Sequence, residues 1–171
     1  MKIRRLAVKK QLKFIVNGNP YDIWIEPRLL LVQVLRDELR LTGTHRGCDS
    51  GTCCVCTVNI DGKAVKSCSV LALQANGKEV LTIEGMANGP KLHPVQEAFV
   101  DNWAFQCGFC TSGQIMASNA LLKENPNPTR EEVQHAMDGH LCRCTGYNMI
   151  NEAIRDAAGR LQAQKSEEKA K

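Results

Sequence analysis

The sequence predicts an α+β fold, with a β-rich N-terminal half and a helical C-terminal half. Short apolar runs in the first half are separated by the turns Asn17-Gly18 and Asp61-Gly62, and such turns are typical of β-hairpins. After residues 85–94, which contain glycines and prolines, the apolar residues recur at helical spacing. The 171 residues suit two small units of this kind.

The first half is expected to form a small mixed sheet that packs against one helix. The strands are predicted over residues 12–16, 21–25, 55–60, 64–68 and 80–83. The helix is predicted over residues 28–39, where Leu31, Val34 and Leu35 fall on one face. A loop with three glycines follows that helix.

Four helices are expected in the second half, which suggests a small bundle. They are predicted to begin at Pro94, Ser112, Thr129 and Tyr147. Pro94 suits a first helical turn, and Thr129 with Glu132 has the spacing of a capping box. Residues 162–171 are polar and charged, so we expect a frayed tail there.

Charge and hydropathy exclude two classes of function. The net charge of +4 comes from basic residues interleaved with acidic ones, without the basic block of a nucleic-acid-binding protein. No apolar run reaches the roughly 18 residues of a membrane span. Met1–Arg5 is basic, but Lys9, Lys10 and Lys13 interrupt any apolar stretch behind it. We therefore expect no export signal and a cytoplasmic location.

Nine cysteines indicate metal or redox chemistry, because a reducing compartment disfavours structural disulfides. The first four are Cys48, Cys53, Cys56 and Cys68. Their C-x4-C-x2-C pattern with a distal cysteine is the spacing of plant-type [2Fe–2S] sites. Gly47 and Gly51 are expected to let the backbone approach the sulfurs and turn with positive φ. The fourth ligand, Cys68, is expected on the neighbouring hairpin strand.

The second group consists of two pairs, C-x2-C and C-x-C. Its members are Cys107, Cys110, Cys142 and Cys144. Each pair precedes a predicted helix, so two helix N-termini would point at one anionic cluster. Zinc remains the alternative metal for this group. It is less favoured for the first group, where only one C-x2-C pair is present. A thioredoxin-like motif fits less well, because no βαβ pattern surrounds the cysteines.

Four segments together resemble the iron–sulfur subunit of molybdenum hydroxylases, the family of xanthine dehydrogenase, aldehyde oxidoreductase, carbon monoxide dehydrogenase and 4-hydroxybenzoyl-CoA reductase. The resemblance extends from about residue 13 to 158. The segments are Gly43–Asp49, Cys53–Val58, Gln106–Thr111 and Leu141–Tyr147. Both cysteine motifs occur in the family's order, which makes the resemblance specific.

The resemblance implies a β-grasp, plant-ferredoxin-like domain over residues 10–84 and a four-helix bundle over 90–162, with 163–171 as a flexible tail. It implies two [2Fe–2S] clusters on eight cysteines and no catalytic residue in this chain. It also implies that the second cluster is buried and lies nearest the molybdopterin of a separate large subunit. Gln106 and Cys144 match the residues that approach the pterin.

The expected role is electron transfer between the molybdenum site of the large subunit and a flavin subunit or external acceptor. The pterin is expected as the cytosine dinucleotide, and FAD on a medium subunit. The cofactors supply the chemistry, and the chain supplies spacing, potential and insulation. A free-standing two-cluster ferredoxin and a zinc-stapled module are the alternatives. The substrate and the direction of electron flow are not encoded in this chain.

Three positions depart from the family pattern. Cys54 replaces a glycine, and we expect it to strain the loop or lie against the cluster without being a ligand. Ser112 replaces a proline, where serine is expected to act as an N-cap. His140 replaces an asparagine. The four histidines are not spaced as a metal site, and no glycine-rich phosphate loop is present.

Overall fold

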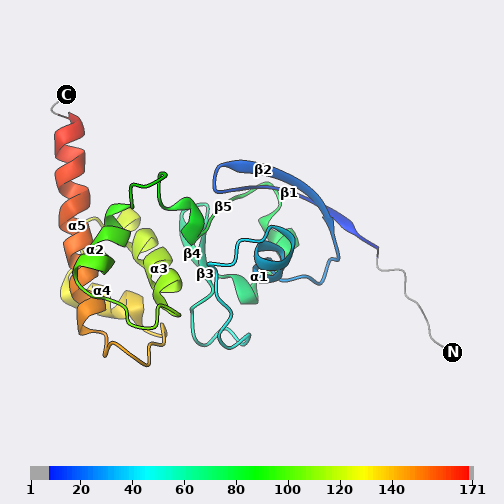
Figure 1. Ribbon diagram of the computed structural model, residues 1–171. Coiled ribbons are helices and arrows are strands. Elements are labelled where there is room, and N and C mark those ends of the chain that lie inside the picture. The colour runs from blue at the N-terminus through cyan, green and yellow to red at the C-terminus, as the bar shows by residue number, and fades with distance from the viewer. Residues whose placement is uncertain (1–7, 170–171) are drawn as a thin grey trace.

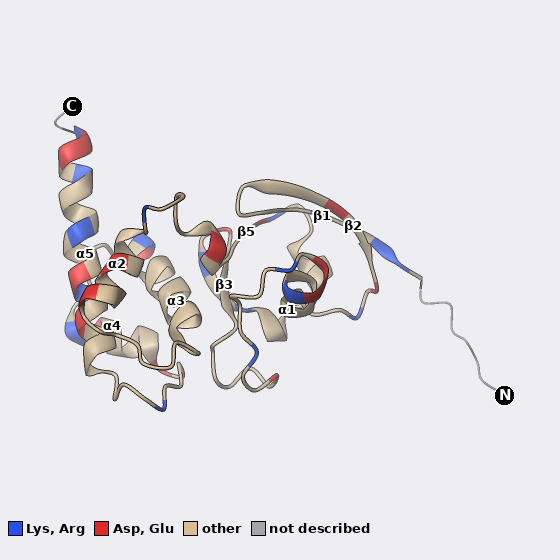
Figure 2. Ribbon diagram, viewed as in Figure 1, with Lys and Arg blue, Asp and Glu red and all other residues tan. Residues whose placement is uncertain are grey.

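A computed structural model describes residues 8–169, so Met1–Arg5 and residues 170–171 lie outside the described part. Figure 1 shows a sheet-containing unit and a helical unit side by side. Lys and Arg alternate with Asp and Glu along the last helix and around the first (Figure 2). Among residues 8–169, no helix combines the length and apolar character needed to cross a membrane.

Five strands form one mixed sheet. They are β1 (Lys10–Val16), β2 (Asn19–Ile25), β3 (Thr57–Ile60), β4 (Lys63–Lys66) and β5 (Glu79–Leu81). Their order is β2-β1-β5-β3-β4, and β1 pairs with β5 in parallel while the other pairs are antiparallel. The predicted mixed sheet is therefore confirmed, but β4 ends two residues earlier than expected.

The predicted helix over residues 28–39 is shorter than expected. It consists of α1 (Leu31–Gln33) and a π-helical turn, Val34–Glu38. Residues 29–31 instead hydrogen-bond to residues 70–72, since the Leu31 amide donates to Val70 and the Ala72 amide to Leu29. This pairing occupies backbone groups that a longer helix would need. Three 3₁₀ turns complete this half: Ser67–Ser69, Ala72–Ala75 and Ile83–Gly85.

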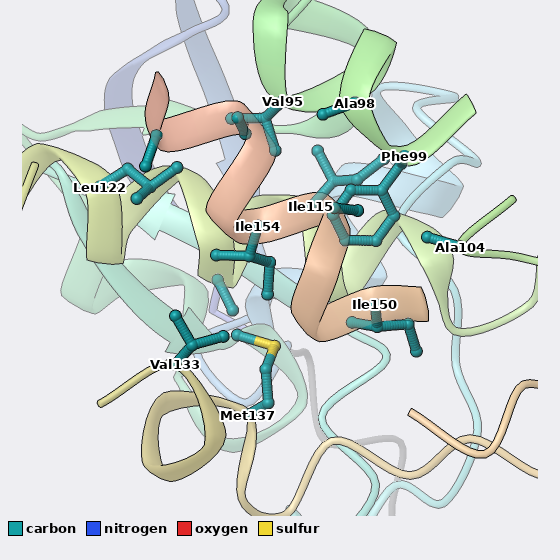
Figure 3. Packing of buried hydrophobic residues seen from close by; sticks show 14 of the residues in the cluster. Val95, Ala98, Phe99, Ala104, Ile115, Leu122, Val133, Met137, Ile150 and Ile154 are labelled. Carbon is teal, nitrogen blue, oxygen red and sulfur yellow. The ribbon is translucent and has the colours of Figure 1, made fainter. Parts of the chain in front are cut away.

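Helices α2 (Pro94–Asp101), α3 (Thr111–Glu124), α4 (Arg130–Met137) and α5 (Asn148–Lys169) form the second half. Helix α2 contacts α3 and α5, and α4 contacts α3 and α5. Figure 3 shows the apolar side chains of these helices pointing toward one another, including Phe99, Ile115, Val133 and Ile154. A second buried cluster, around Leu12, lies under the sheet.

Two helix ends test the sequence predictions. The Thr129 hydroxyl accepts from the Glu132 amide at 3.2 Å, and the Glu132 carboxylate accepts from the Thr129 amide at 2.7 Å. The capping box is therefore confirmed. Helix α5 continues to Lys169, past residue 162 where the tail was expected to begin, and the flexibility of this end stays a prediction. Residues 162–169 are exposed, and the Gln162 side chain donates to the Pro126 carbonyl at 2.9 Å.

The two halves meet where α3 packs on β3. The buried Asn59 side chain of β3 donates to the Met116 carbonyl at 2.9 Å and accepts from Asn119 at 2.7 Å. A Cβ added at Gly113 would lie 2.6 Å from the Cys54 carbonyl oxygen and 2.9 Å from Val55. Helix α3 can therefore lie directly on the first cysteine loop only because residue 113 has no side chain.

Candidate metal centres

The first cysteine group lies on the loop that leads into β3. Cys53 and Cys56 are buried, and Cys48 is exposed at the edge of the loop. Cys68 was expected on the hairpin strand. It lies instead in the 3₁₀ turn that follows β4. The turn places it beside Cys56, with which it shares a small buried cluster around Val32.

Backbone amides already surround the Cys48 sulfur. The amides of Ser50 and Cys53 each donate to it at 3.4 Å. Donation from Ser50, and then from Cys53, lowers the pKa of Cys48 to about 6. Burial is the main cause that raises the pKa of Cys56 to about 11, and the neighbouring Cys68 thiol is a smaller cause. A metal that binds here must therefore displace the proton of Cys56, whereas Cys48 is already largely a thiolate at neutral pH.

The two glycines divide the roles predicted for both. A Cβ at Gly47 would lie 3.0 Å from the Cys53 sulfur, whereas Gly51 has the positive φ, +74°, and approaches the Ser69 hydroxyl instead of a sulfur. The Lys66 ammonium donates to the Gly51 carbonyl at 2.8 Å and holds the loop against β4.

Two charged side chains support the start of the loop, and sequence reasoning missed both. Arg36 donates to the carbonyls of Thr42 and Thr44 at 2.6 and 2.8 Å. The Glu84 carboxylate accepts from the Gly43 amide at 2.8 Å. No local motif marks either residue, because both contacts are made to backbone atoms, which carry no side-chain pattern.

The second cysteine group is brought together at the ends of α3 and α5. All four of its cysteines line one cavity of about 520 Å³, together with Phe109, Leu141, Arg143 and Tyr147. The sulfurs of Cys107 and Cys144 lie 3.5 Å apart. Cys110 is the N-cap residue of α3, and the C-x-C pair precedes α5. The structure thus places both pairs before helices at one site, as the sequence indicated.

The thiols of this group differ in their surroundings. Burial, with Cys142 alongside, raises the pKa of Cys110 to about 12. Burial also opposes ionisation of Cys142, but the hydroxyl and amide of Thr145 donate to its sulfur and leave its pKa below the ordinary value. The Cys142 amide donates to the Tyr147 hydroxyl at 2.7 Å, which fixes the C-x-C turn.

The donor set and its surroundings fit a thiolate-bound iron–sulfur cluster. Four cysteines line one cavity, and the buried Gln114 side chain, whose Nε2 has no hydrogen-bond partner, contacts the Cys110 sulfur. Within residues 8–169, no three His, Cys, Asp or Glu side chains are grouped as a single metal ion requires.

The open side of this cavity carries the two residues expected to approach a pterin. The Gln106 amide donates to the Cys144 carbonyl at 3.2 Å, and both residues are exposed. Cys107 is exposed as well, whereas Cys110 is buried. One edge of the cavity is therefore exposed in this chain by itself, and burial of the second centre against a large subunit stays a prediction.

The three departures from the family pattern have different outcomes. Cys54 has φ +62° and a buried thiol directed toward Gly139, where an added Cβ would lie 3.7 Å from its sulfur. Its left-handed backbone is strained for any residue but glycine. Ser112 is not the N-cap, because Cys110 occupies that position and the Ser112 hydroxyl has no partner. His140 is largely buried, and burial lowers its pKa to about 4.

The other histidines have structural contacts. His93 caps α2 by accepting from the Val95 amide at 3.2 Å. His135 pairs with Asp138 on the surface of α4. His45 stacks on Phe109.

Comparison with known proteins adds to this geometry. Residues 82–155 match the model of a [2Fe-2S] binding domain. The chain is 47% identical over 146 residues to the small subunit of nicotine 6-hydroxylase from Paenarthrobacter nicotinovorans, covering 85% of this chain and 88% of that one. It is 40% identical to the iron–sulfur-binding subunit of an aldehyde oxidoreductase from Escherichia coli K12, covering 86% and 71%.

Solved structures have the same fold. Quinoline 2-oxidoreductase from Pseudomonas putida 86 matches with a TM-score of 0.87 at 42% identity, covering 91% of this chain and 98% of that chain. Aldehyde oxidoreductase from Desulfovibrio gigas matches with a TM-score of 0.87 at 39% identity. There the match covers 91% of this chain and 17% of that chain.

Proposed function

This chain belongs to the family of small iron–sulfur subunits of molybdenum hydroxylases, and we propose that each of its two cysteine groups holds one [2Fe–2S] cluster. The chain is the non-catalytic electron-transfer subunit of a molybdopterin-dependent oxidoreductase. The observation that carries the assignment is the convergence of Cys107, Cys110, Cys142 and Cys144 on one cavity. The proposed ligands of the other cluster are Cys48, Cys53, Cys56 and Cys68.

The exposed edge at Cys107 and Cys144 is proposed to face the large subunit, with Gln106 next to its pterin. Phe109 and Leu141 line the cavity beside this edge, and both of these large apolar side chains are exposed. Such a patch on a soluble chain indicates a protein interface. A partner would cover the patch and withdraw the cluster from water.

The two centres adjoin through both packing and a hydrogen bond. Cys53 and Cys110 belong to one buried cluster, with Val55 between the two loops and Cys142 packed against it. The Leu141 amide donates to the Cys53 carbonyl at 3.1 Å. These contacts support electron transfer between the two clusters within the chain.

The finer architecture is also a proposal. The mixed sheet, whose buried residues share one cluster with Leu31 of α1, supports a β-grasp, plant-ferredoxin-like domain over residues 10–84. The reciprocal contacts of α2, α3, α4 and α5 support a four-helix bundle over 90–162. We further propose molybdopterin cytosine dinucleotide on the large subunit, FAD on a medium subunit, and a cytoplasmic complex.

Metal analysis of the chain purified with its partners in the absence of air tests the assignment. We expect about four irons per chain, absorbance that bleaches with dithionite, and two reduced-cluster signals in electron paramagnetic resonance. Cys110→Ser is expected to remove one signal and Cys56→Ser the other. Stoichiometric zinc in a colourless protein would contradict the proposal. Purification without a large subunit would favour a free-standing ferredoxin.

A further inference from the structure

Gln114 is a buried amide that touches a proposed cluster ligand. It lies one turn into α3 and is 1% exposed. Its Oε1 lies 3.6 Å from the Cys110 sulfur, and its Nε2 has no hydrogen-bond partner. A buried amide donor left without a partner costs about 1–3 kcal/mol, so the site indicates an acceptor for Nε2.

The contact with Cys110 changes when that thiol becomes a ligand. In the metal-free chain the Cys110 S–H donates to Gln114 Oε1. A metal-bound thiolate has no proton to donate, and its negative charge repels a carbonyl oxygen. A half-turn of the amide exchanges Oε1 and Nε2 within nearly the same volume. The N–H group then faces the sulfur, and the unpartnered donor gains its acceptor.

We propose that Gln114 donates an N–H···S hydrogen bond to Cys110 of the second cluster and thereby raises the reduction potential of that cluster. The proposal rests on the proposed function, since it requires a cluster at this site. Reduction adds one electron to the cluster and its thiolates, so a donor stabilises the reduced form more than the oxidised form. Gln114 is thus a residue that tunes the potential.

A control residue lies one turn further along α3. The Ser118 hydroxyl donates to the main-chain carbonyl of Gln114 at 2.7 Å and does not contact its side-chain amide. Ser118 is as buried as Gln114, and its hydroxyl has a backbone partner. Ser118→Ala therefore provides a matched control, because it changes the same buried helix without removing a donor from a cysteine.

The test is a potentiometric titration of the assembled complex, in which paramagnetic resonance follows each cluster separately. In Gln114→Met, we expect the reduced-to-oxidised ratio of the second cluster at a fixed potential to fall about tenfold, which is about 59 mV for one electron. The first cluster and the Ser118→Ala complex are expected to keep their midpoints. In the wild-type complex, the paramagnetic resonance of the second cluster is expected to show one strong proton coupling that disappears in D₂O. The Gln114→Met complex is expected to lack this coupling before exchange.

Gln114→Asn gives the same test if the methionine variant does not accumulate, because its shorter amide withdraws the donor and keeps a polar group. An unchanged midpoint of the second cluster, or an equal shift of both clusters, would overturn the role of Gln114. A wild-type complex without two clusters would instead overturn the proposed function, so the two failures are distinguishable.

Discussion

His45 lies flat against Phe109, with ring centroids 4.9 Å apart and ring planes 3° from parallel. Its Nδ1–H group also donates to the Phe109 carbonyl at 2.8 Å. His45 precedes the first cysteine loop, and Phe109 lies between Cys107 and Cys110. One side chain therefore links the surroundings of both proposed clusters.

Replacement of His45 should loosen that link. His45→Ala removes a hydrogen bond and a ring contact, and we expect a loss of about 1 kcal/mol in the free energy of unfolding. His45→Phe keeps the stack and should lose less. Urea denaturation measures the change, with His135→Ala on the surface of α4 as the control. Equal effects of His45→Ala and His135→Ala would show that the stack contributes nothing.

The Asn59–Asn119 pair should be more costly to break. Asn119→Ala leaves the buried Asn59 Oδ1 without its donor at the junction of β3 and α3, and we expect a loss of about 1–3 kcal/mol. Thermal and urea unfolding measure the loss. Asn125→Ala is the control, because the Asn125 amide reaches the Glu132 carboxylate at an exposed site. A loss no larger than that of the control would refute the importance of the buried pair.

Gly113 is expected to tolerate no side chain. Gly113→Ala would place a Cβ 2.6 Å from the Cys54 carbonyl, and overpacking of this kind costs about 1–3 kcal/mol. Gly159→Ala is the matched control, since nothing lies within 4 Å of its Cβ position in α5. That change should stabilise the chain by about 0.5–1 kcal/mol through helix propensity. If the two substitutions change the free energy of unfolding in opposite directions, the close approach of α3 to the loop is borne out. If both change it in the same direction, the close approach is contradicted.

Cys54→Gly tests which cysteines hold metal. The substitution relieves the left-handed backbone at φ +62° and leaves the eight proposed ligands in place. We expect unchanged iron content and unchanged resonance signals, measured beside Cys53→Ser as a positive control for loss of a ligand. Loss of iron from Cys54→Gly would mean that Cys54 replaces one of the proposed ligands.

Features with a local cause could be predicted from the sequence. The capping box at Thr129 joins neighbouring residues, and the hairpin turns are fixed by dipeptides such as Asp61-Gly62. The grouping of the cysteines followed from their spacing. These patterns are short because the forces behind them act over a few residues.

The remaining features depend on contacts between distant segments. Helix α1 is shortened by pairing with residues 70–72, and Arg36 and Glu84 support the cysteine loop through backbone atoms that no motif identifies. The unpartnered Gln114 donor is visible only once burial is known. Helix α5 extends further than expected, because the polar composition of its end is compatible with a solvated helix as well as with coil.

The exposed edge at Cys107 and Cys144 has a consequence for biogenesis. Until the large subunit covers it, a newly inserted cluster would meet dissolved oxygen at these two sulfurs. Oxygen would then have more access to the cluster in the unassembled chain than in the assembled complex. Cells that make this protein aerobically would gain from inserting the second cluster late, or from keeping the orphan subunit scarce.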